Sequence, residues 1–489
     1  MSSKEMFSSR WAVVLVGLGM AVGTGNIWRF PRVVAENGGG AFLIAWLVFL
    51  FTWSIPLLIA EFSIGRKTRR GPVGAFAELN GSNSAWLGGF VVVVTVMIMF
   101  YYSVVTGWAL KYAIAAATGG LGRVDPESFW LEYSESFWQP SLFHIVSIAV
   151  AGMIVSRGIS NGIERASRIL IPLLFALLLC AVVRAVTLSG ASAGLSFLFV
   201  PDVSEFLNYE MWLEALTQSA WSTGAGWGLL LSYAIYVKKS EDVVSQSVRI
   251  GVGNNLASIL AAMAILPAEF AVINPGEARE ALASGNVGLT FVWIPRLFSE
   301  MPAGDYLLPV FFVALFSAAL SSLIAMVELA SRALIDRGMR RERAVRVVVS
   351  VSIVCGLPSA FSLAVFENQD WVWSLGLMIS GSFIALAAIR YGVQTFRTQL
   401  VNTHTRGIQV GRWYEWWLSY IVPILFVAMF GWWMYQSVVV YEPDGWWNPL
   451  QILSVGTCIV QWGVVLVALR LMNARLLAGD STRHATLNG

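Results

Sequence analysis

Charged residues, histidines and cysteines are all scarce in this chain. Of its 489 residues, 12% are charged and 57% are hydrophobic, whereas soluble domains carry roughly 25% charged residues. A chain with so little charge cannot cover a soluble core, which indicates a protein that crosses a lipid bilayer many times. The net charge of +3 is too small to indicate nucleic-acid binding.

The few cysteines and histidines are also scattered. Cys180, Cys355 and Cys458 lie far apart in apolar stretches, so their spacing matches neither a disulfide framework nor a metal site. The three histidines are equally dispersed. An enzyme working inside the membrane would need a clustered acid–base or metal set, so we expect a protein that is not an enzyme.

Twelve apolar segments are suited to cross a bilayer as helices. They lie near residues 10–35, 41–65, 86–117, 142–156, 163–187, 211–237, 243–273, 306–335, 344–364, 371–392, 414–436 and 447–472. The sequence therefore predicts an all-α polytopic membrane protein with twelve transmembrane helices. An even number of helices places both termini on the same side of the bilayer.

Basic and acidic residues occupy alternate loops between these segments. The basic loops carry Arg66, Lys67, Arg69, Arg70, Arg157, Arg165, Lys238, Lys239, Arg337, Arg340, Arg343, Arg397 and Arg412. The opposite loops carry Asp125, Glu127, Glu132, Asp202, Glu205, Glu367, Asp370, Glu442 and Asp444. Because loops rich in arginine and lysine stay in the cytoplasm, we expect a multi-pass protein of the cell (inner) membrane with both termini cytoplasmic.

Two of the predicted helices contain residues that interrupt helices. The first carries Gly23-Thr24-Gly25-Asn26, and the sixth carries WSTGAGWG at residues 221–228. They are five helices apart, so the breaks occupy matching places in two halves of opposite orientation, a 5+5 inverted repeat. Discontinuous helices free carbonyl oxygens and helix ends that can hold a cation and a carboxylate, which indicates a transporter site. We divide the chain into the first repeat, the second repeat, helices 11 and 12, and a polar tail, at residues 1–190, 191–395, 396–475 and 476–489.

Three stretches carry a resemblance to a known family. They are GNIWRFP at residues 25–31, ENGGGAF at 36–42 and IPLLIAEFSIGR at 55–66. In these stretches the chain closely resembles the neurotransmitter:sodium symporters, whose bacterial amino-acid transporters include the leucine transporter. The resemblance extends across nearly all twelve helices, and it implies sodium-driven symport by alternating access.

The resemblance implies two sodium sites. The first would use the Ala21 carbonyl, Asn26, Ser222 and Asn254, with the substrate carboxylate completing the ligand set. The second would use the carbonyls of Gly19, Val22 and Ala318 and the hydroxyls of Ser321 and Ser322. These oxygen donors suit a hard cation. As an alternative for Ser321 and Ser322, both serines could hydrogen-bond only to their own helix.

The resemblance also implies a substrate pocket. Its lining would be Met20, Ala21, Thr24, Gly25, Ile98, Tyr102, Trp221, Ser222, Gly224, Trp227, Ser322 and Met326. Tyr102 matches the family tyrosine that contacts the substrate carboxylate. Without the resemblance, Tyr102 would be interpreted as an ordinary packed aromatic residue. Gly23 stands where the monoamine carriers of the family have an aspartate. The substrate should therefore bring its own carboxylate.

Two pairs of gating residues follow from the same resemblance. Arg29 matches the extracellular gate arginine, with Asp370 as its partner, and Phe30 is expected to help close the pocket from water. Alternatively, Asp370 is an exposed loop acid. At the cytoplasmic side the matching residues are Lys4 and Asp336, where lysine replaces an arginine and loses its bidentate fork.

Three further positions match family elements with a conformational role. Gly162 and Pro172 match an element of helix 5 that is thought to unwind, although locally they could mark only a helix start and a kink. Glu61 matches a glutamate that contacts the broken part of helix 6. Phe7 replaces a tryptophan of the cytoplasmic gate and lacks the indole donor.

The family's chloride site has partial counterparts in this chain. The matching residues are Trp46, Gln218, Ser222, Asn254 and Ser258, with tryptophan replacing a tyrosine. Chloride-independent bacterial members carry an acid where this chain has Ser258. Since two sodium ions beside one carboxylate need further negative charge, we expect chloride to stimulate transport, unless another carboxylate serves.

These features together predict sodium-coupled symport of a neutral, hydrophobic amino acid into the cell. Gly224 enlarges the pocket while Met20, Trp221 and Trp227 reduce it, so the size of the substrate stays open. Alternatives are uptake of another zwitterion with a carboxylate, such as a betaine or a β- or γ-amino acid, and an amino-acid sensor that does not transport. The expected partners are the small-molecule substrate and the lipid bilayer, with no nucleic acid, and the sequence leaves the oligomeric state open.

Overall fold

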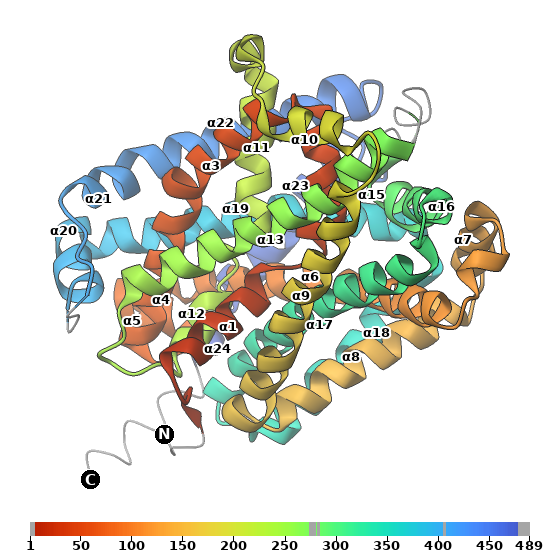
Figure 1. Ribbon diagram of the computed structural model, residues 1–489. Coiled ribbons are helices and arrows are strands. Elements are labelled where there is room, and N and C mark those ends of the chain that lie inside the picture. Colours follow the sequence, from red (N-terminus) through yellow and green to blue (C-terminus); the bar gives the residue numbers. More distant parts are fainter. Residues whose placement is uncertain (1–4, 273–279, 281–283, 404–406, 478–489) are drawn as a thin grey trace.

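The computed structural model describes residues 5–272, 280, 284–403 and 407–477. Apart from one isolated bridge between Gly39 and Pro201, the regular structure of these residues is helical (Figure 1). The long α-helices are α6 (Ala85–Ala117), α8 (Gln139–Ser156), α9 (Arg165–Val186), α13 (Val243–Val272), α17 (Gly304–Asp336), α18 (Arg341–Phe361), α19 (Leu363–Tyr391), α22 (Val422–Gln436) and α23 (Val455–Leu471).

Nine helices in the described ranges are long and apolar enough to cross a membrane. They are Gly40–Thr68, Ser82–Ala117, Gln139–Ser156, Ile159–Val186, Val243–Val272, Gly304–Asp336, Arg341–Phe361, Leu363–Tyr391 and Trp413–Tyr441. The bent pair Arg10–Ala21 and Gly25–Glu36 makes a tenth, and α23 is a shorter apolar helix. The all-helical, multi-spanning prediction is confirmed, whereas the count of twelve stays a prediction.

The first predicted helix is broken where its glycines are. Helix α1 (Arg10–Ala21) ends before Val22, whose backbone is extended, and the chain resumes as a π-helical turn at Gly25–Arg29 and then α2 (Phe30–Glu36). The two parts are bent by 61°.

A second break separates α11 (Tyr209–Ser222) from α12 (Leu229–Ala234). Here Gly224, Gly226 and Gly228 have φ values of +67°, +94° and +75°. Side chains other than glycine are strained at such angles, so these three glycines permit the interruption. Both predicted breaks are present.

The last apolar helix begins later than expected. The segment predicted from residue 447 is a series of turns up to Ser454, and α23 begins at Val455. Pro449 cannot donate a helical hydrogen bond, and the Ser454 side chain accepts from the Thr457 N–H as an N-cap. Short helices outside the twelve predicted segments include α5 (Pro72–Asn80), α7 (Pro126–Ser134), α10 (Ala191–Phe199) and α16 (Ile294–Glu300).

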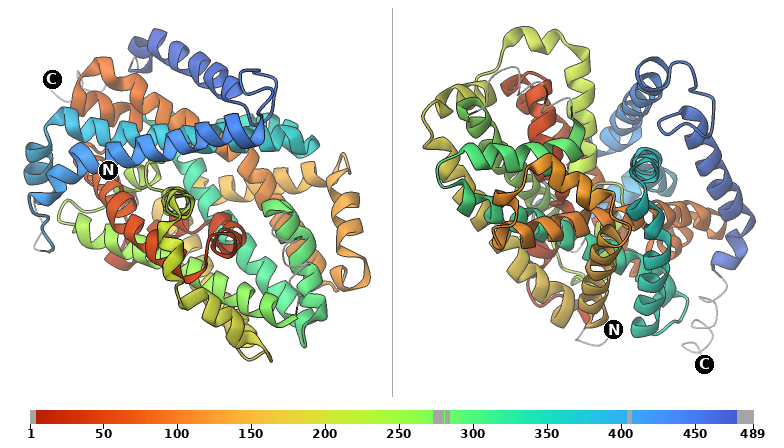
Figure 2. Two further views of the ribbon diagram at one scale, coloured as in Figure 1. Left: turned by 90° about the horizontal axis from the view of Figure 1, so that it is seen from above. Right: turned by 90° about the vertical axis from the view of Figure 1, so that its right-hand side faces the viewer.

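Helices α6 and α17 form the interior of the bundle. Their apolar segments are 78% and 83% buried, against 28% for the segment Trp413–Tyr441 that contains α22. Figure 2 shows the C-terminal helices, in dark blue, at the periphery of the bundle. The first broken helix packs against α13 and α17, and the second packs against α3 (Gly40–Phe49), α4 (Ile55–Thr68) and α17, which places both interruptions inside the protein.

Candidate substrate and sodium site

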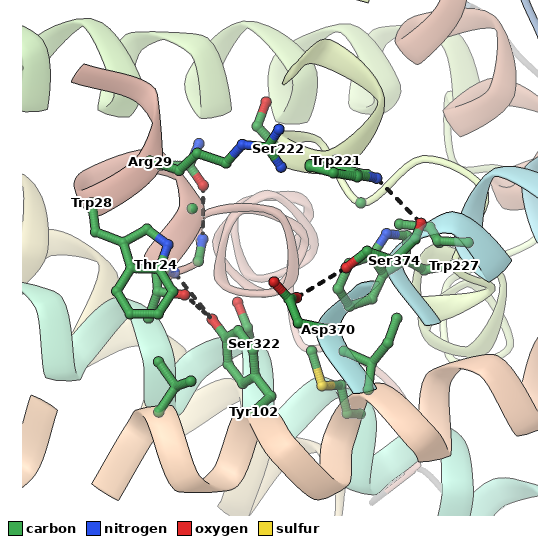
Figure 3. Close-up of a pocket in the computed structure, with 18 of the residues that line it drawn as sticks. Thr24, Trp28, Arg29, Tyr102, Trp221, Ser222, Trp227, Ser322, Asp370 and Ser374 are labelled. Atoms are coloured by element: carbon green, nitrogen blue, oxygen red, sulfur yellow. Dashed lines mark hydrogen bonds between the residues drawn. The ribbon is translucent and has the colours of Figure 1, made fainter. Parts of the chain in front are cut away.

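A cavity of about 120 Å³ lies where the two helix breaks face α6 and α17 (Figure 3). All twelve residues predicted to bind substrate line it. They come from the first break, from α6, from the second break and from α17, which are far apart in sequence. The folded chain therefore brings this predicted set together.

One wall of the cavity presents backbone and hydroxyl groups. The Thr24 N–H donates to the Tyr102 hydroxyl oxygen at 3.0 Å, as Figure 3 shows. A Cβ atom added to Gly25 would meet no atom within 4 Å, so the backbone there is open to a ligand. A Cβ atom added to Gly23 would lie 2.8 Å from the Tyr102 hydroxyl and 3.1 Å from Ser322 Oγ. Glycine at position 23 thus keeps a space between these hydroxyls.

The residues predicted for the first sodium site also converge. The Asn26 side-chain N–H donates to Asn254 Oδ1 and to Ser258 Oγ, both at 2.8 Å. The Asn254 side-chain amide also lies 2.8 Å from the Ser222 carbonyl oxygen and 3.1 Å from the Ala21 carbonyl oxygen. Carbonyl, amide and hydroxyl oxygens thus converge here, and such oxygen donors fit a hard cation.

The second predicted sodium site has a similar cluster of oxygens. Ser322 Oγ lies 3.4 Å from the carbonyl oxygens of Gly19 and Met20, and 3.3 Å from that of Val22. Ser322 therefore reaches across to the broken helix instead of bonding to its own helix.

Ser321 behaves differently from its neighbour. Its hydroxyl donates to the Ala318 carbonyl at 2.9 Å, which is the local bond that the sequence left open as an alternative. Ser321 and Ala318 are nevertheless both buried, and a Cβ atom added to Gly19 would lie 3.4 Å from Ser321 Cβ.

The predicted outer gate residues lie in the cavity wall without forming an ion pair with each other. Arg29 stacks on the Trp221 ring, with 3.6 Å between the guanidinium carbon and the ring centroid. Asp370 accepts from Ser374 Oγ at 3.1 Å. Among the described residues no salt bridge joins Arg29 to Asp370, so the cavity extends between them.

The expectation that Phe30 faces this cavity is wrong. Phe30 is fully buried away from it, with its ring centroid 4.3 Å from that of Trp46, and it also packs on Phe42. Consecutive residues on a helix point in different directions, and Phe30 points toward Trp46 while Arg29 points into the cavity. The aromatic ring that lines the cavity next to Arg29 is that of Trp221.

The predicted inner gate is seen only in part, because Lys4 lies outside the described residues. Asp336 forms an ion pair with Arg332 at 2.5 Å and accepts from the Gly71 N–H at 2.7 Å. Phe7 is buried and makes edge contacts with Tyr233 and Tyr236.

A second contact holds the same N-terminal segment, and the sequence did not indicate it. Glu164 is 2% exposed and accepts from the Ser8 N–H at 3.0 Å and from Ser8 Oγ at 2.5 Å. Arg168 donates to both residues. Glu164 ends the π-helical turn Ile159–Glu164, which contains Gly162. The N-terminus is therefore attached to the element that was expected to unwind.

Comparison with known proteins identifies the family. Residues 4–140 and 138–477 match the sodium:neurotransmitter symporter family. The chain belongs to this family. A sodium-dependent transporter of Methanocaldococcus jannaschii is 32% identical over 87% of this chain and 89% of its own length. A sodium-dependent transporter of Bacillus subtilis is 30% identical over 87% of this chain and 96% of its own length. Both relatives are named uncharacterized sodium-dependent transporters.

A solved structure supports the same assignment. The crystal structure of MhsT in complex with L-phenylalanine superimposes with a TM-score of 0.75 at 29% identity. It covers 88% of this chain and 99% of the MhsT chain. This symporter is therefore a multi-pass membrane protein and a sodium-dependent transporter, not an enzyme.

The residues of this symporter that match the family's chloride site fall into two groups with different surroundings. Ser222, Asn254 and Ser258 belong to the polar cluster described above. Trp46 Nε1 and Gln218 Oε1 are buried, and neither has a hydrogen-bond partner in the described part of the chain. A donor and an acceptor thus remain unsatisfied near the first break.

Sequence reasoning missed the contribution of α19 to the cavity. Ser374 and Leu377 line it, and the Trp221 indole N–H donates to the Ser374 carbonyl at 3.2 Å. Phe366 and Tyr101 line it as well. No local motif marks these positions, because their role depends on how α19 packs against α6 and α11.

The Glu61 carboxylate accepts from the Gly226 N–H and from the Leu231 N–H, the latter at 3.3 Å. The expected contact between Glu61 and the broken part of helix 6 is therefore present. Since Glu61 is fully buried, these backbone donors satisfy its charge and fix the second break.

Proposed function

We propose that this protein imports a neutral, hydrophobic amino acid together with sodium by alternating access. The observation that carries the proposal is the cavity between the two breaks, with an oxygen cluster at each side of it. Its lining contains only two charged residues in the described part, Arg29 and Asp370, and both lie at the predicted outer gate. A zwitterion can be held there by backbone groups and hydroxyls, with sodium balancing its carboxylate.

The carboxylate position follows from the polar wall. The Thr24 and Gly25 backbone and the Tyr102 hydroxyl border the open space next to Gly25. A substrate carboxylate in that space would also approach the Ala21 and Asn254 oxygens through a sodium ion. Ion and substrate would then bind together, because each offsets the charge of the other.

The far end of the cavity suits an apolar side chain. Met20, Ile98, Trp227, Met326 and Leu377 line it. The structure of MhsT was determined with L-phenylalanine, and that protein shares the fold. Large aromatic and aliphatic amino acids are therefore the first candidates.

Another zwitterion is the second candidate. A Cβ atom added to Gly224 would lie at least 3.8 Å from its neighbours, so the break leaves room beside Met20. A betaine or a β- or γ-amino acid could use that room. Transport and sensing are separated by counterflow: a transporter exchanges labelled substrate into preloaded liposomes, whereas a sensor only binds it.

Chloride stimulation is part of the proposal. The buried Trp46 N–H, on a ring that packs on Phe30, has no partner among the described residues, and an anion is a suitable partner for a buried donor. Two sodium ions and one carboxylate leave a positive charge that chloride would balance. Uptake by liposomes in chloride-free gluconate buffer tests this step, and full activity there would contradict it.

The arrangement in the membrane is proposed from the sequence. It comprises twelve helices in two inverted repeats of five with two further helices, both termini in the cytoplasm and a location in the cell (inner) membrane. The two breaks, in α1–α2 and α11–α12, support the repeat because both line the same cavity.

A thermal-shift screen tests the substrate assignment directly. The purified protein is heated with each of the twenty amino acids and with common betaines, in sodium and in potassium buffer. We expect stabilisation by large neutral amino acids in sodium only. Stabilisation by amines that lack a carboxylate, or equal stabilisation in potassium, would contradict the proposal.

A further inference from the structure

A second, apolar crevice shares no lining residue with the substrate cavity. It measures about 300 Å³ and lies between α6, α17, α18 and the C-terminal helices α23 and α24 (Asn473–Leu476). Its apolar lining comes from Val73, Gly89, Val92, Val93, Val96, Met99, Phe100, Ala330, Ala333, Leu334, Val347, Val348, Val351, Leu469 and Leu476. We call this space the α18–α23 crevice.

The crevice is open toward the bilayer. Val347 is 39% exposed and Val351 is 46% exposed, and both belong to a helix of the membrane-spanning kind. The opposite rim is formed by α23, which lies at the periphery of the bundle (Figure 2). Apolar space of this kind at membrane depth is accessible to acyl chains.

One end of the crevice carries a single charged residue. Arg337 follows the last residue of α17 and lines both this crevice and a smaller adjoining pocket at Gly71 and Asp336. Its side chain is exposed, and it forms no hydrogen bond or ion pair with any described residue. The neighbouring arginines differ: Arg332 is paired with Asp336, and Arg341 is paired with Glu328. Arg337 is thus available to an anion.

A second copy of the chain is a poorer occupant. In a two-fold interface each residue faces its own counterpart or a near neighbour. Such an interface over this crevice would bring Arg337 of each copy close to the other, together with the exposed Arg343 and Arg346 of α18. These like charges would repel each other across a surface with few free acids.

We propose that an anionic phospholipid binds in the α18–α23 crevice, with its phosphate on Arg337 and an acyl chain along α6. Basic pockets between transmembrane helices at the cytoplasmic side suit such headgroups. The positive-inside expectation places Arg337 at that side, where anionic lipids carry their charge near the crevice mouth. The lipid would fill the gap between α18 and the last helices and hold them together.

Native mass spectrometry of the purified full-length chain tests this proposal. The probes are phosphatidylglycerol and phosphatidylcholine with the same acyl chains. We expect the wild type to retain phosphatidylglycerol preferentially. Arg337→Gln should lower that retention about fivefold, because one basic residue contributes about 1 kcal/mol to binding an anionic lipid. Retention of phosphatidylcholine should not change.

Two further variants make the test specific. Arg343→Gln removes an exposed arginine that does not line the crevice, and it should leave both lipids unaffected. Val96→Phe adds volume inside the crevice and should lower retention of both lipids. Sodium-dependent substrate binding, measured in parallel, shows that each variant is folded.

Three results would overturn the proposal. Equal retention of the two lipids by the wild type would show that no anion site exists. Equal losses in Arg337→Gln and Arg343→Gln would show a general surface attraction. Efficient disulfide cross-linking between copies of a Val351→Cys variant in membranes would show that a second chain covers the crevice.

Discussion

Replacing Glu164 by glutamine should weaken the attachment of the N-terminal segment to helix 5. This change should favour the form of the protein in which that segment is released. Glu164 is almost fully buried, and its carboxylate holds Ser8 through a backbone N–H at 3.0 Å and a hydroxyl at 2.5 Å. Glutamine has nearly the same shape but no charge. It can still accept one bond from Ser8, so the change removes charge assistance without leaving a cavity.

The size of the effect follows from these contacts. Arg168 is 51% exposed, so its ion pair with Glu164 contributes little after solvent screening. The bonds from Ser8 to a buried carboxylate are stronger, about 1.5–3 kcal/mol each, and part of that contribution is lost. We expect a loss of about 2 kcal/mol in the closed form, which increases the open fraction roughly 30-fold.

A cysteine at Ser167 reports this opening. Ser167 of α9 is buried, and a Cβ atom on Gly19 would lie 3.4 Å from its hydroxyl, so it faces the predicted second sodium site. The three native cysteines are first replaced by alanine. The rate at which a charged thiol reagent labels Ser167→Cys then follows the open population when opening and closing are fast.

The expected result is labelling roughly 30-fold faster in the Glu164→Gln background, and slower again when sodium is added. Glu342→Gln, at an exposed position in the first turn of α18, serves as the control and should not change the rate. The reasoning is refuted if Glu164→Gln binds sodium normally and is labelled at the rate of the control.

Three further substitutions probe the candidate site. Gly23→Asp should abolish amino-acid binding, because its Cβ would lie 2.8 Å from the Tyr102 hydroxyl and its carboxylate would compete for the groups that the substrate carboxylate is proposed to contact; a calorimetric titration that still detects substrate would contradict this. Ser322→Ala should raise the half-saturating sodium concentration about tenfold, since a hydrogen-bonding oxygen contributes roughly 1–1.5 kcal/mol. Ser317→Ala, one turn earlier and bonded to its own helix, is the matched control and should leave sodium affinity unchanged. Ser222→Ala should weaken sodium-dependent substrate binding, and a variant with wild-type sodium dependence in a thermal-shift assay would remove Ser222 from the first site.

The sequence by itself determined the class of the protein and the positions of its two helix breaks. Low charge and long apolar segments exclude a soluble fold whatever the tertiary arrangement. Gly224, Gly226 and Gly228 predict an interruption because their preferred backbone angles are local properties. Within the family motif at residues 25–31, Gly25, Asn26 and Arg29 line the cavity, whereas Phe30 does not.

Only the tertiary structure decided which side chains share a face and which partners they choose. Phe30 follows Arg29 in sequence, yet it packs on Trp46 instead of lining the cavity. Ser374 and Leu377 line the cavity only because α19 lies against it, and Ser8 meets Glu164 across a separation of 156 residues. Local propensity carries no information about contacts between distant segments. These contacts depend on how whole helices pack, and packing is a property of the complete bundle.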